Sequence, residues 1–150
     1  MELTSSAFPE GGNIPSIYTC DGKDINPPLE IKNVPSKARA LVLILDDPDV
    51  PSFVRKDNMW VHWVIYNMPP DTRQIKENST PPGVQGKGTG GEAKYQGPCP
   101  PDREHRYFFK LYALDKPLSL KPGATKAEVE AAMKEHILEK AQLIGRYVRQ

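Results

Sequence analysis

Several features that define whole classes of protein are missing from this sequence. No apolar run approaches the roughly 18 residues that a membrane-spanning helix needs. Residues 1–9 lack the basic and apolar regions of a secretory signal, so the sequence predicts a cytoplasmic protein with no integral membrane segment. Neither sign of charge dominates, with 20 basic and 19 acidic side chains, and the absence of a basic field argues against nucleic-acid binding.

Cysteine is scarce, whereas proline is abundant. Cys20 and Cys99 are too few for a disulfide framework or a zinc ribbon, and in a cytosol both thiols are expected to be reduced. The 16 prolines in 150 residues are about twice the ordinary share of roughly 5%. They separate short apolar runs, which is typical of loops in a folded protein. The length predicts one domain, residues 1–150, around one hydrophobic core.

Short apolar runs predict that much of the chain is β structure. Three runs rich in aliphatic, aromatic and β-branched side chains each end at a turn signal: residues 40–45, 60–66 and 106–114. Weaker strands are expected at residues 1–5, 17–19 and 143–148. The segment 67–97 is rich in glycine and proline and predicts a long loop, a common place for functional residues.

One helix is expected near the C-terminus. Thr125 and Glu128 fit a capping box, and apolar side chains from Val129 to Ile137 recur at helical spacing. The predicted fold class is therefore a mainly β, antiparallel domain with a C-terminal helix. Residues 86–91 formally satisfy G-x-G-x-x-G, but no strand precedes them and no helix follows, so we interpret them as a glycine loop.

Polar side chains gather near the ends of the three strong strands. Asp47 follows the first strand, His62 lies in the second, and His105 and Tyr107 open the third. Period-two alternation places His105 and Tyr107 on one face of their strand. If the second and third strands are neighbours, the two histidines and the tyrosine converge on one spot beneath the turn at Gly97. Taken singly, each of these residues is more readily explained as part of the core.

The same alternation places His62 on one face with Val64 and Tyr66. Taken alone, a histidine within an apolar strand is usually a core residue with its hydrogen bonds satisfied, and the sequence by itself does not show convergence.

These segments resemble the two signature regions of the phosphatidylethanolamine-binding protein (Raf kinase inhibitor protein-like) family. The family's Asp-Pro-Asp-x-Pro motif is matched at 47–51, ahead of His62, and its Gly-Pro turn with His-x-Tyr is matched at Gly97, Pro98, His105 and Tyr107. The form Gly-Pro-Cys-Pro-Pro is similar to the bacterial and archaeal branch. The likeness extends almost end to end, through residues 8–12, 18–22 and 142–147. Residues 26–31 lack a tryptophan that is usual in the family.

The resemblance implies a large antiparallel sheet packed on a smaller one, with a pocket for a phosphorylated or anionic small molecule. The ligand-binding residues would be Asp47, His62, Gly97, Pro98, His105 and Tyr107, with no cofactor and no metal. The histidines and the tyrosine can donate to phosphoryl oxygens, and glycine allows close approach of the backbone. The aspartate would orient a histidine or accept a proton from the ligand.

Two consequences of this implied site can be checked. Histidines titrate near neutral pH, so anion affinity is expected to rise as the pH falls from about 8 to 6. Pro48 and Pro98 are candidates for cis peptide bonds that would fix the two turns.

The implied function is a binding or regulatory module, which in some members inhibits kinases or serine proteases. A homodimer is a reasonable expectation from prokaryotic relatives. One alternative is a hydrolase or phosphoryl-transfer enzyme that uses the same pocket, although the sequence has no G-x-S-x-G nucleophile motif. Another is a metal site with two histidines and one carboxylate, at Asp47, His62 and His105. Because Cys20 and Cys99 lie in family-matching loops, a bridge between them is the alternative to two free thiols.

Overall fold

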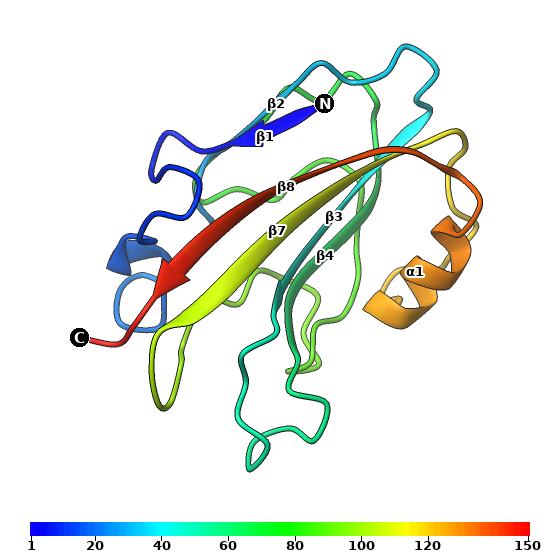
Figure 1. Ribbon diagram of the computed structural model, residues 1–150. Coiled ribbons are helices and arrows are strands. Elements are labelled where there is room, and N and C mark those ends of the chain that lie inside the picture. Colours follow the sequence, from blue (N-terminus) through cyan, green and yellow to red (C-terminus); the bar gives the residue numbers. More distant parts are fainter.

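Two antiparallel sheets and one α-helix make up the computed structural model, which describes all 150 residues (Figure 1). The large sheet has the strand order β6-β4-β3-β7-β8, and the small sheet has the order β1-β2-β5. The helices are η1 (Ser16–Tyr18), a 3₁₀ turn, and α1 (Lys126–Met133). The strands are β1 (Glu2–Thr4), β2 (Leu29–Lys32), β3 (Ala40–Asp47), β4 (Trp60–Met68), β5 (Gln74–Ile75), β6 (Val84–Gln85), β7 (His105–Leu114) and β8 (Ile137–Tyr147). The predicted fold class is confirmed.

The large sheet is covered on both faces, which explains the continuous apolar run of its central strand. All eight residues of β3 are buried. Leu41, Leu43 and Leu45 point into the core shared with the small sheet, whereas Val42 and Ile44 belong to a second cluster beneath α1. A strand buried on both sides needs apolar residues at every position. Figure 1 shows the resulting layers, with the small sheet on one side of the large sheet and α1 on the other.

Helix α1 begins as predicted but ends earlier. The Thr125 side chain accepts a hydrogen bond from the backbone N–H of Glu128, and the Glu128 side chain bonds back to complete the capping box. The helix stops at Met133, and Glu135 adopts a left-handed backbone conformation with φ of 73°. Ile137, expected in the helix, instead begins β8 and pairs with Leu114. Sheet pairing therefore overrides the helical periodicity of the last turn.

Five further differences separate the structure from the sequence prediction. Residues 17–19 are not a strand, because η1 occupies most of that segment. The last strand begins at Ile137 instead of residue 143, and β2 was not predicted. The loop at 67–97 contains the two short strands β5 and β6. The peptide bonds preceding Pro48 and Pro98 are trans.

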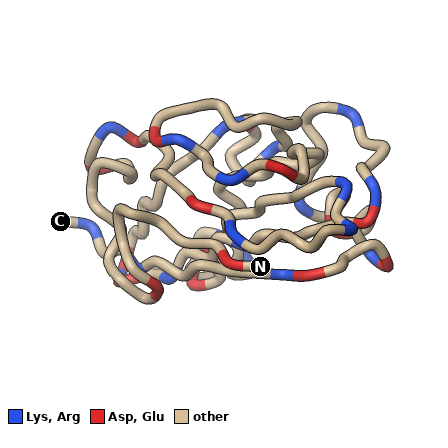
Figure 2. Tube along the Cα trace, turned by 90° about the horizontal axis from the view of Figure 1, so that it is seen from above, with Lys and Arg blue, Asp and Glu red and all other residues tan.

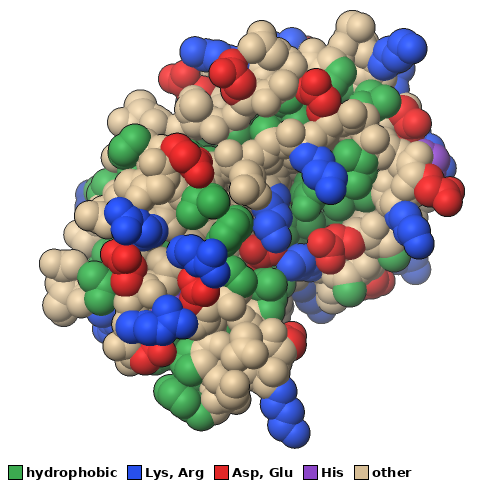
Figure 3. Space-filling view, viewed as in Figure 1, with side chains coloured by type: hydrophobic (Ala, Val, Ile, Leu, Met, Phe, Trp, Pro, Cys, Tyr) green, Lys and Arg blue, Asp and Glu red, His purple; other side chains and the backbone are tan.

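Charges of both signs alternate along the chain and over the visible surface (Figures 2 and 3). No basic field of the kind that attracts nucleic acid gathers on the face in Figure 3. None of the helices has the length and apolar character required to cross a membrane.

Candidate ligand-binding site

A cavity of about 220 Å³ lies at one end of the large sheet, where β3 ends and β4 and β7 begin. Five of the six predicted ligand-binding residues line it: Asp47, His62, Gly97, His105 and Tyr107. Pro98 is not among the lining residues, and its carbonyl accepts a hydrogen bond from the backbone N–H of Cys20 at 3.1 Å. The rest of the lining is mostly apolar and consists of Val50, Val54, Trp60, Gln96, Cys99, Pro100 and Pro101.

The strands that carry the two histidines are not neighbours, contrary to the condition set for their convergence. β3 lies between β4 and β7 in the sheet order. It contributes Asp47 from its last position, so the carboxylate sits between the strands of His62 and His105. The rings of His62 and Tyr107 nevertheless meet edge-on, with centroids 5.4 Å apart.

A β-bulge in β4 brings His62 to the cavity. Leu45 of β3 pairs with Trp63, but the next residue, Asp46, pairs with Val61, so His62 is an extra residue without a partner in the register. Val64 packs in the outer cluster beneath α1, whereas His62 faces the cavity. The prediction that these two residues share a face is therefore wrong. An extra residue breaks period-two alternation, and bulges commonly redirect a side chain in this way.

His62 is held as a neutral ring. Its Nδ1 lies 2.7 Å from the backbone carbonyl of Gln96, which can only accept, so Nδ1 carries the proton. Burial lowers the pKa of His62 to about 4. The ring is then uncharged between pH 8 and 6, and the expectation that both histidines gain charge over that range is not met by His62. In this state Nε2 is a hydrogen-bond acceptor and not a donor.

His105 is fully buried and lies between two carboxylates. Its Nδ1 is 2.6 Å from Asp47 Oδ2, and its Nε2 is 2.6 Å from Asp102 Oδ1. The ring donates to both carboxylates only when both nitrogens carry protons. Burial raises the pKa of Asp47, while the bond to His105 opposes that shift. The expected orienting role of Asp47 matches this geometry.

Tyr107 brings a buried hydroxyl to the same place. Its Oη has no hydrogen-bond partner in the protein, although the residue is fully buried. Burial, together with the nearby Asp47 carboxylate, raises the pKa of the phenol, so the hydroxyl keeps its proton. A buried hydroxyl without a partner is costly, at about 1–3 kcal/mol, and such groups call for an explanation.

The Gly97 turn forms one wall of the cavity and is fixed by the segment after η1. The N–H of Gly97 donates to Asp24 Oδ1 at 2.8 Å. A Cβ at this position would lie 2.3 Å from both Asp24 Oδ1 and the Tyr18 carbonyl oxygen. The neighbouring chain therefore requires glycine at this position.

Cys20 and Cys99 form a disulfide, which corrects the prediction of two reduced thiols. The bond joins residues separated by 79 positions, and Cys99 itself lines the cavity. A reducing environment would favour free thiols, but the fold brings the two Cα atoms to 5.4 Å, within bonding geometry.

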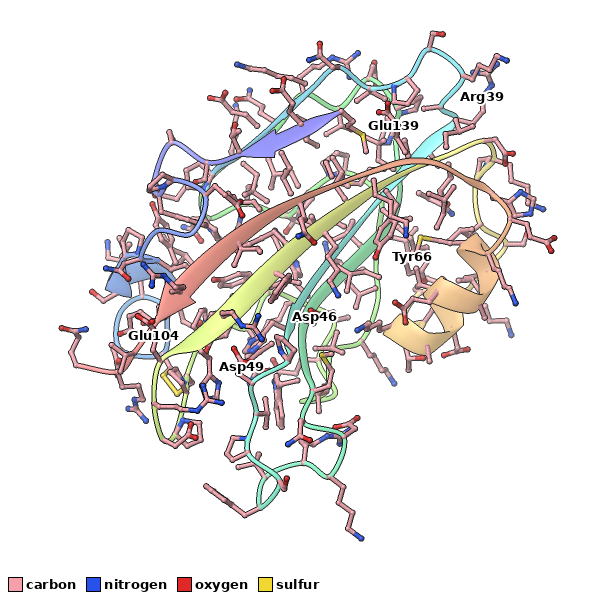
Figure 4. All side chains as sticks on the ribbon, in the orientation of Figure 1. Arg39, Asp46, Asp49, Tyr66, Glu104 and Glu139 are labelled. Atoms are coloured by element: carbon pink, nitrogen blue, oxygen red, sulfur yellow. A yellow bond between two sulfur atoms is a disulfide. The ribbon has the colours of Figure 1, made fainter.

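Ion pairs fasten the cavity rim to the sheet. Asp49 forms a bidentate pair with the guanidinium of Arg106 at 2.9 and 3.0 Å and also accepts the Arg106 backbone N–H. Figure 4 shows Asp49 and Glu104 at the same end of the large sheet. Beyond Asp49, the loop to β4 projects from the molecule (Figure 1) and exposes 81% of Phe53.

The proposed two-histidine, one-carboxylate metal site is not supported by this geometry. Both nitrogens of His105 already face carboxylate oxygens, and Nδ1 of His62 donates to a carbonyl. No group of three His, Cys, Asp or Glu side chains is arranged to hold a metal ion.

Three site residues were missed in the sequence: Trp60, Gln96 and Asp102. The Trp60 indole N–H donates to Gln96 Oε1 at 3.0 Å, and the backbone of Gln96 bonds His62 through both its N–H and its carbonyl. Trp60 was visible as part of an aromatic strand, but nothing in the sequence indicates the partner of Asp102. Its position three residues before His105 is the one available signal.

Comparison with known proteins identifies relatives over nearly the whole chain. The model of the phosphatidylethanolamine-binding protein family matches residues 4–148. A protein named UPF0098 from Methanothermobacter thermautotrophicus is 51% identical over an alignment of 155 positions, which covers 99% of each chain. A protein of the same name from Chlamydia trachomatis is 48% identical over 147 residues, with 98% of each chain covered.

Two solved structures are similar along their full length. The first, CT736 from Chlamydia trachomatis, is described as a phosphatidylethanolamine-binding protein homolog. It has a TM-score of 0.97 at 47% identity and covers 99% of this chain and 97% of its own. Escherichia coli YbcL has a TM-score of 0.88 at 24% identity, covering 99% of this chain and 98% of its own. At that identity, the second likeness shows the fold alone.

Proposed function

The chain belongs to the phosphatidylethanolamine-binding protein family, and from this premise we propose that its cavity binds a small oxyanion or the phosphoryl part of a head group. A volume of about 220 Å³ is below the 300 Å³ or more usual for drug-sized ligands, which favours a compact group. The mostly apolar lining with a few convergent polar atoms is the usual composition of a ligand site.

The unpartnered hydroxyl of Tyr107 is the observation that carries the proposal. The free-energy cost of this unpaired hydroxyl is removed when an oxygen of a bound ligand accepts a hydrogen bond from it. Among acceptors, a phosphoryl oxygen is favoured because a charged acceptor makes a bond about twice as strong as a neutral one.

His62 adds a second requirement for the ligand. Because its Nδ1 donates to Gln96, the neutral ring offers an acceptor at Nε2. A fully ionised phosphate has only acceptors to offer, whereas a phosphoryl group that retains one proton has both acceptors and a donor. The cavity therefore favours a singly protonated phosphate or a monoester in its monoanionic form.

The lining favours binding over the alternative enzymatic function. It contains no serine or threonine, and its one sulfur, that of Cys99, is held in the disulfide. The hydroxyl nucleophiles of serine and threonine and the free thiol of cysteine are thus lacking from the cavity.

A protein target, such as the kinase or protease implied by the family resemblance, would meet the protein at the cavity rim. The projecting loop exposes Phe53, and its neighbour Val54 both lines the cavity and is 43% exposed. Exposed aromatic and aliphatic side chains beside a polar pocket are typical of a recognition surface.

The proposal is tested by NMR titration of the ¹⁵N-labelled protein with inorganic phosphate and with phosphoethanolamine. Saturable shifts are expected at the amides of Gly97, His105 and Tyr107. The variant Tyr107→Phe should bind about tenfold more weakly, since a hydrogen bond to a charged group contributes about 1.5 kcal/mol or more.

Tyr112→Phe is the matched control. Tyr112 lies on the same strand, loses the same hydroxyl and belongs to the cluster on the opposite face of the sheet. The Tyr112→Phe variant should bind phosphate and phosphoethanolamine with the affinity of the wild type. Absence of saturable shifts in folded wild-type protein, or equal affinity in Tyr107→Phe, would contradict the proposed function.

A further inference from the structure

Asp102 makes a contact that the proposed site does not require. It lies in the loop between Gly97 and β7, and its carboxylate is 2.6 Å from Nε2 of His105. The His105 side chain is fully buried, whereas that of Asp102 is 31% exposed. Asp102 is not itself a lining residue, but it directly follows Pro101, which lines the cavity, and its carboxylate bonds the one cavity ring that is hydrogen-bonded at both nitrogens.

The chemistry of this contact is that of a bound anion. A carboxylate, like a phosphoryl group, presents negatively charged oxygens at about 2.6–2.9 Å to an imidazole N–H. The other nitrogen of His105 is already committed to Asp47. An oxyanion that bonds His105 can therefore do so only at Nε2, the atom that Asp102 occupies.

Asp102 also has a second partner available outside the cavity. Its Oδ2 lies 3.8 Å from Nε of Arg103, whose side chain is 62% exposed. A carboxylate released from His105 would remain beside this guanidinium and exposed to water. Displacement of Asp102 therefore does not leave an ionised group buried without a partner, which would cost much free energy.

We propose that Asp102 is an internal competitor for the anion site, whose carboxylate holds Nε2 of His105 until an oxyanion ligand replaces it. The inference rests on the proposed function and adds a residue that determines specificity. Only a ligand that can substitute for a carboxylate on an imidazole N–H gains from the exchange, so oxyanions are selected over neutral molecules. The competition also lowers the apparent affinity, because only the fraction of molecules with Asp102 displaced is ready to bind.

The test compares Asp102→Ala with Glu104→Ala. Both remove one carboxylate from the same loop, but the Glu104 carboxylate faces Arg146 at 3.6 Å and makes no hydrogen bond to the His105 ring. The probes are inorganic phosphate and acetate, the latter a free copy of the aspartate side chain. Asp102→Ala should bind both about tenfold more tightly than the wild type, the lower end of what a charge-assisted hydrogen bond contributes. Glu104→Ala should change affinity by less than about twofold, the effect of an exposed charge.

A second measurement reads the contact without any ligand. The ¹⁵N signal of His105 Nε2 should shift in Asp102→Ala and stay in place in Glu104→Ala, while the dispersed amide spectrum reports that each variant is folded. Asp102→Asn, which keeps the size of the side chain and removes the charge, should give an intermediate gain in affinity.

The outcomes separate the two proposals. Equal gains in Asp102→Ala and Glu104→Ala would mean that charge alone matters, and unchanged or weaker binding in Asp102→Ala would mean that Asp102 orients His105. Either result would contradict the proposal that Asp102 competes with the ligand for His105. If the His105 signal shifts in Asp102→Ala but no variant binds either anion, the contact between Asp102 and His105 is real and the proposed anion binding is wrong. In that case the proposed competition is wrong as well.

Discussion

At the scale of single residues, burial of His62 ties the stability of the fold to pH. The ring is buried in the folded protein with a pKa of about 4, against 6.5 when exposed. Above pH 6.5 the ring is neutral in both states and contributes nothing to the pH dependence. As the pH falls from 6.5 to 4, the unfolded chain takes up a proton that the folded protein does not, so this histidine makes unfolding progressively more favourable.

We predict that His62→Gln is less sensitive to acid than the wild type. Between pH 7 and 4.5 its free energy of unfolding should fall by about 2.5 kcal/mol less, because glutamine does not titrate. Urea denaturation at the two pH values measures the difference. Equal losses in the wild type and in His62→Gln would show that His62 is not held neutral.

The residues of the site could be found from the sequence, but their hydrogen bonds could not. Strand-end position and residue type made Asp47, His62, His105 and Tyr107 candidates, and the family resemblance assigned them to one pocket. The donor and acceptor roles depend on distant partners: the Gln96 carbonyl makes His62 an acceptor, and Asp102 occupies the free nitrogen of His105. These roles depend on which residues lie close together in the folded protein, and no periodicity in the sequence indicates them.

At the scale of elements, the disulfide joins the segment after η1 to the Gly97 turn, which forms one wall of the cavity. Besides the covalent bond, the N–H of Cys20 donates to the Pro98 carbonyl, and the Tyr95 hydroxyl donates to the Tyr18 carbonyl at 2.7 Å. The segment after η1 and the Gly97 turn are therefore held side by side by hydrogen bonds as well as by the cross-link.

Removing the cross-link should destabilise the protein substantially. The double variant Cys20→Ser/Cys99→Ser should lose about 4.5 kcal/mol of unfolding free energy, the chain-entropy estimate for a closed loop of this length. Urea denaturation measures this loss. The wild type reduced with dithiothreitol should lose the same amount of unfolding free energy. Labelling of the denatured, unreduced wild type should find no free thiol. Equal stability of the oxidised and reduced wild type would contradict this account.

Elements with strong composition were predicted, and elements set by pairing were not. The strands β3, β4 and β7 follow from their apolar runs, and the start of α1 follows from its capping box. The four residues of β2, which follow Pro27 and Pro28, form a strand because β1 and β5 pair with them. Likewise, the bulge at His62 is visible only in the register between β3 and β4.

At the scale of the whole molecule, the large sheet separates two apolar clusters, and only one of them contacts the candidate site. The larger cluster lies between the sheets and includes Leu45 and Tyr107, next to the cavity. The smaller one lies beneath α1 and includes Val129. Asp46, buried on this outer face, accepts from Lys126 at 2.7 Å and ties the start of the helix to the sheet (Figure 4). Both clusters stabilise the fold, but only the first touches the candidate site.

This separation predicts that stability and binding can be uncoupled. Val129→Ala, at a fully buried residue beneath α1, should cost about 2 kcal/mol of unfolding free energy and leave phosphate affinity unchanged, because the sheet stands between it and the cavity. Leu45→Ala, two residues before Asp47 on the cavity face, should cost about 3 kcal/mol and also weaken binding. Urea denaturation and phosphate titration of both variants give the comparison. If Val129→Ala weakens binding as much as Leu45→Ala, the sheet transmits packing changes between its faces, and the cavity depends on the whole fold instead of on the inner core alone.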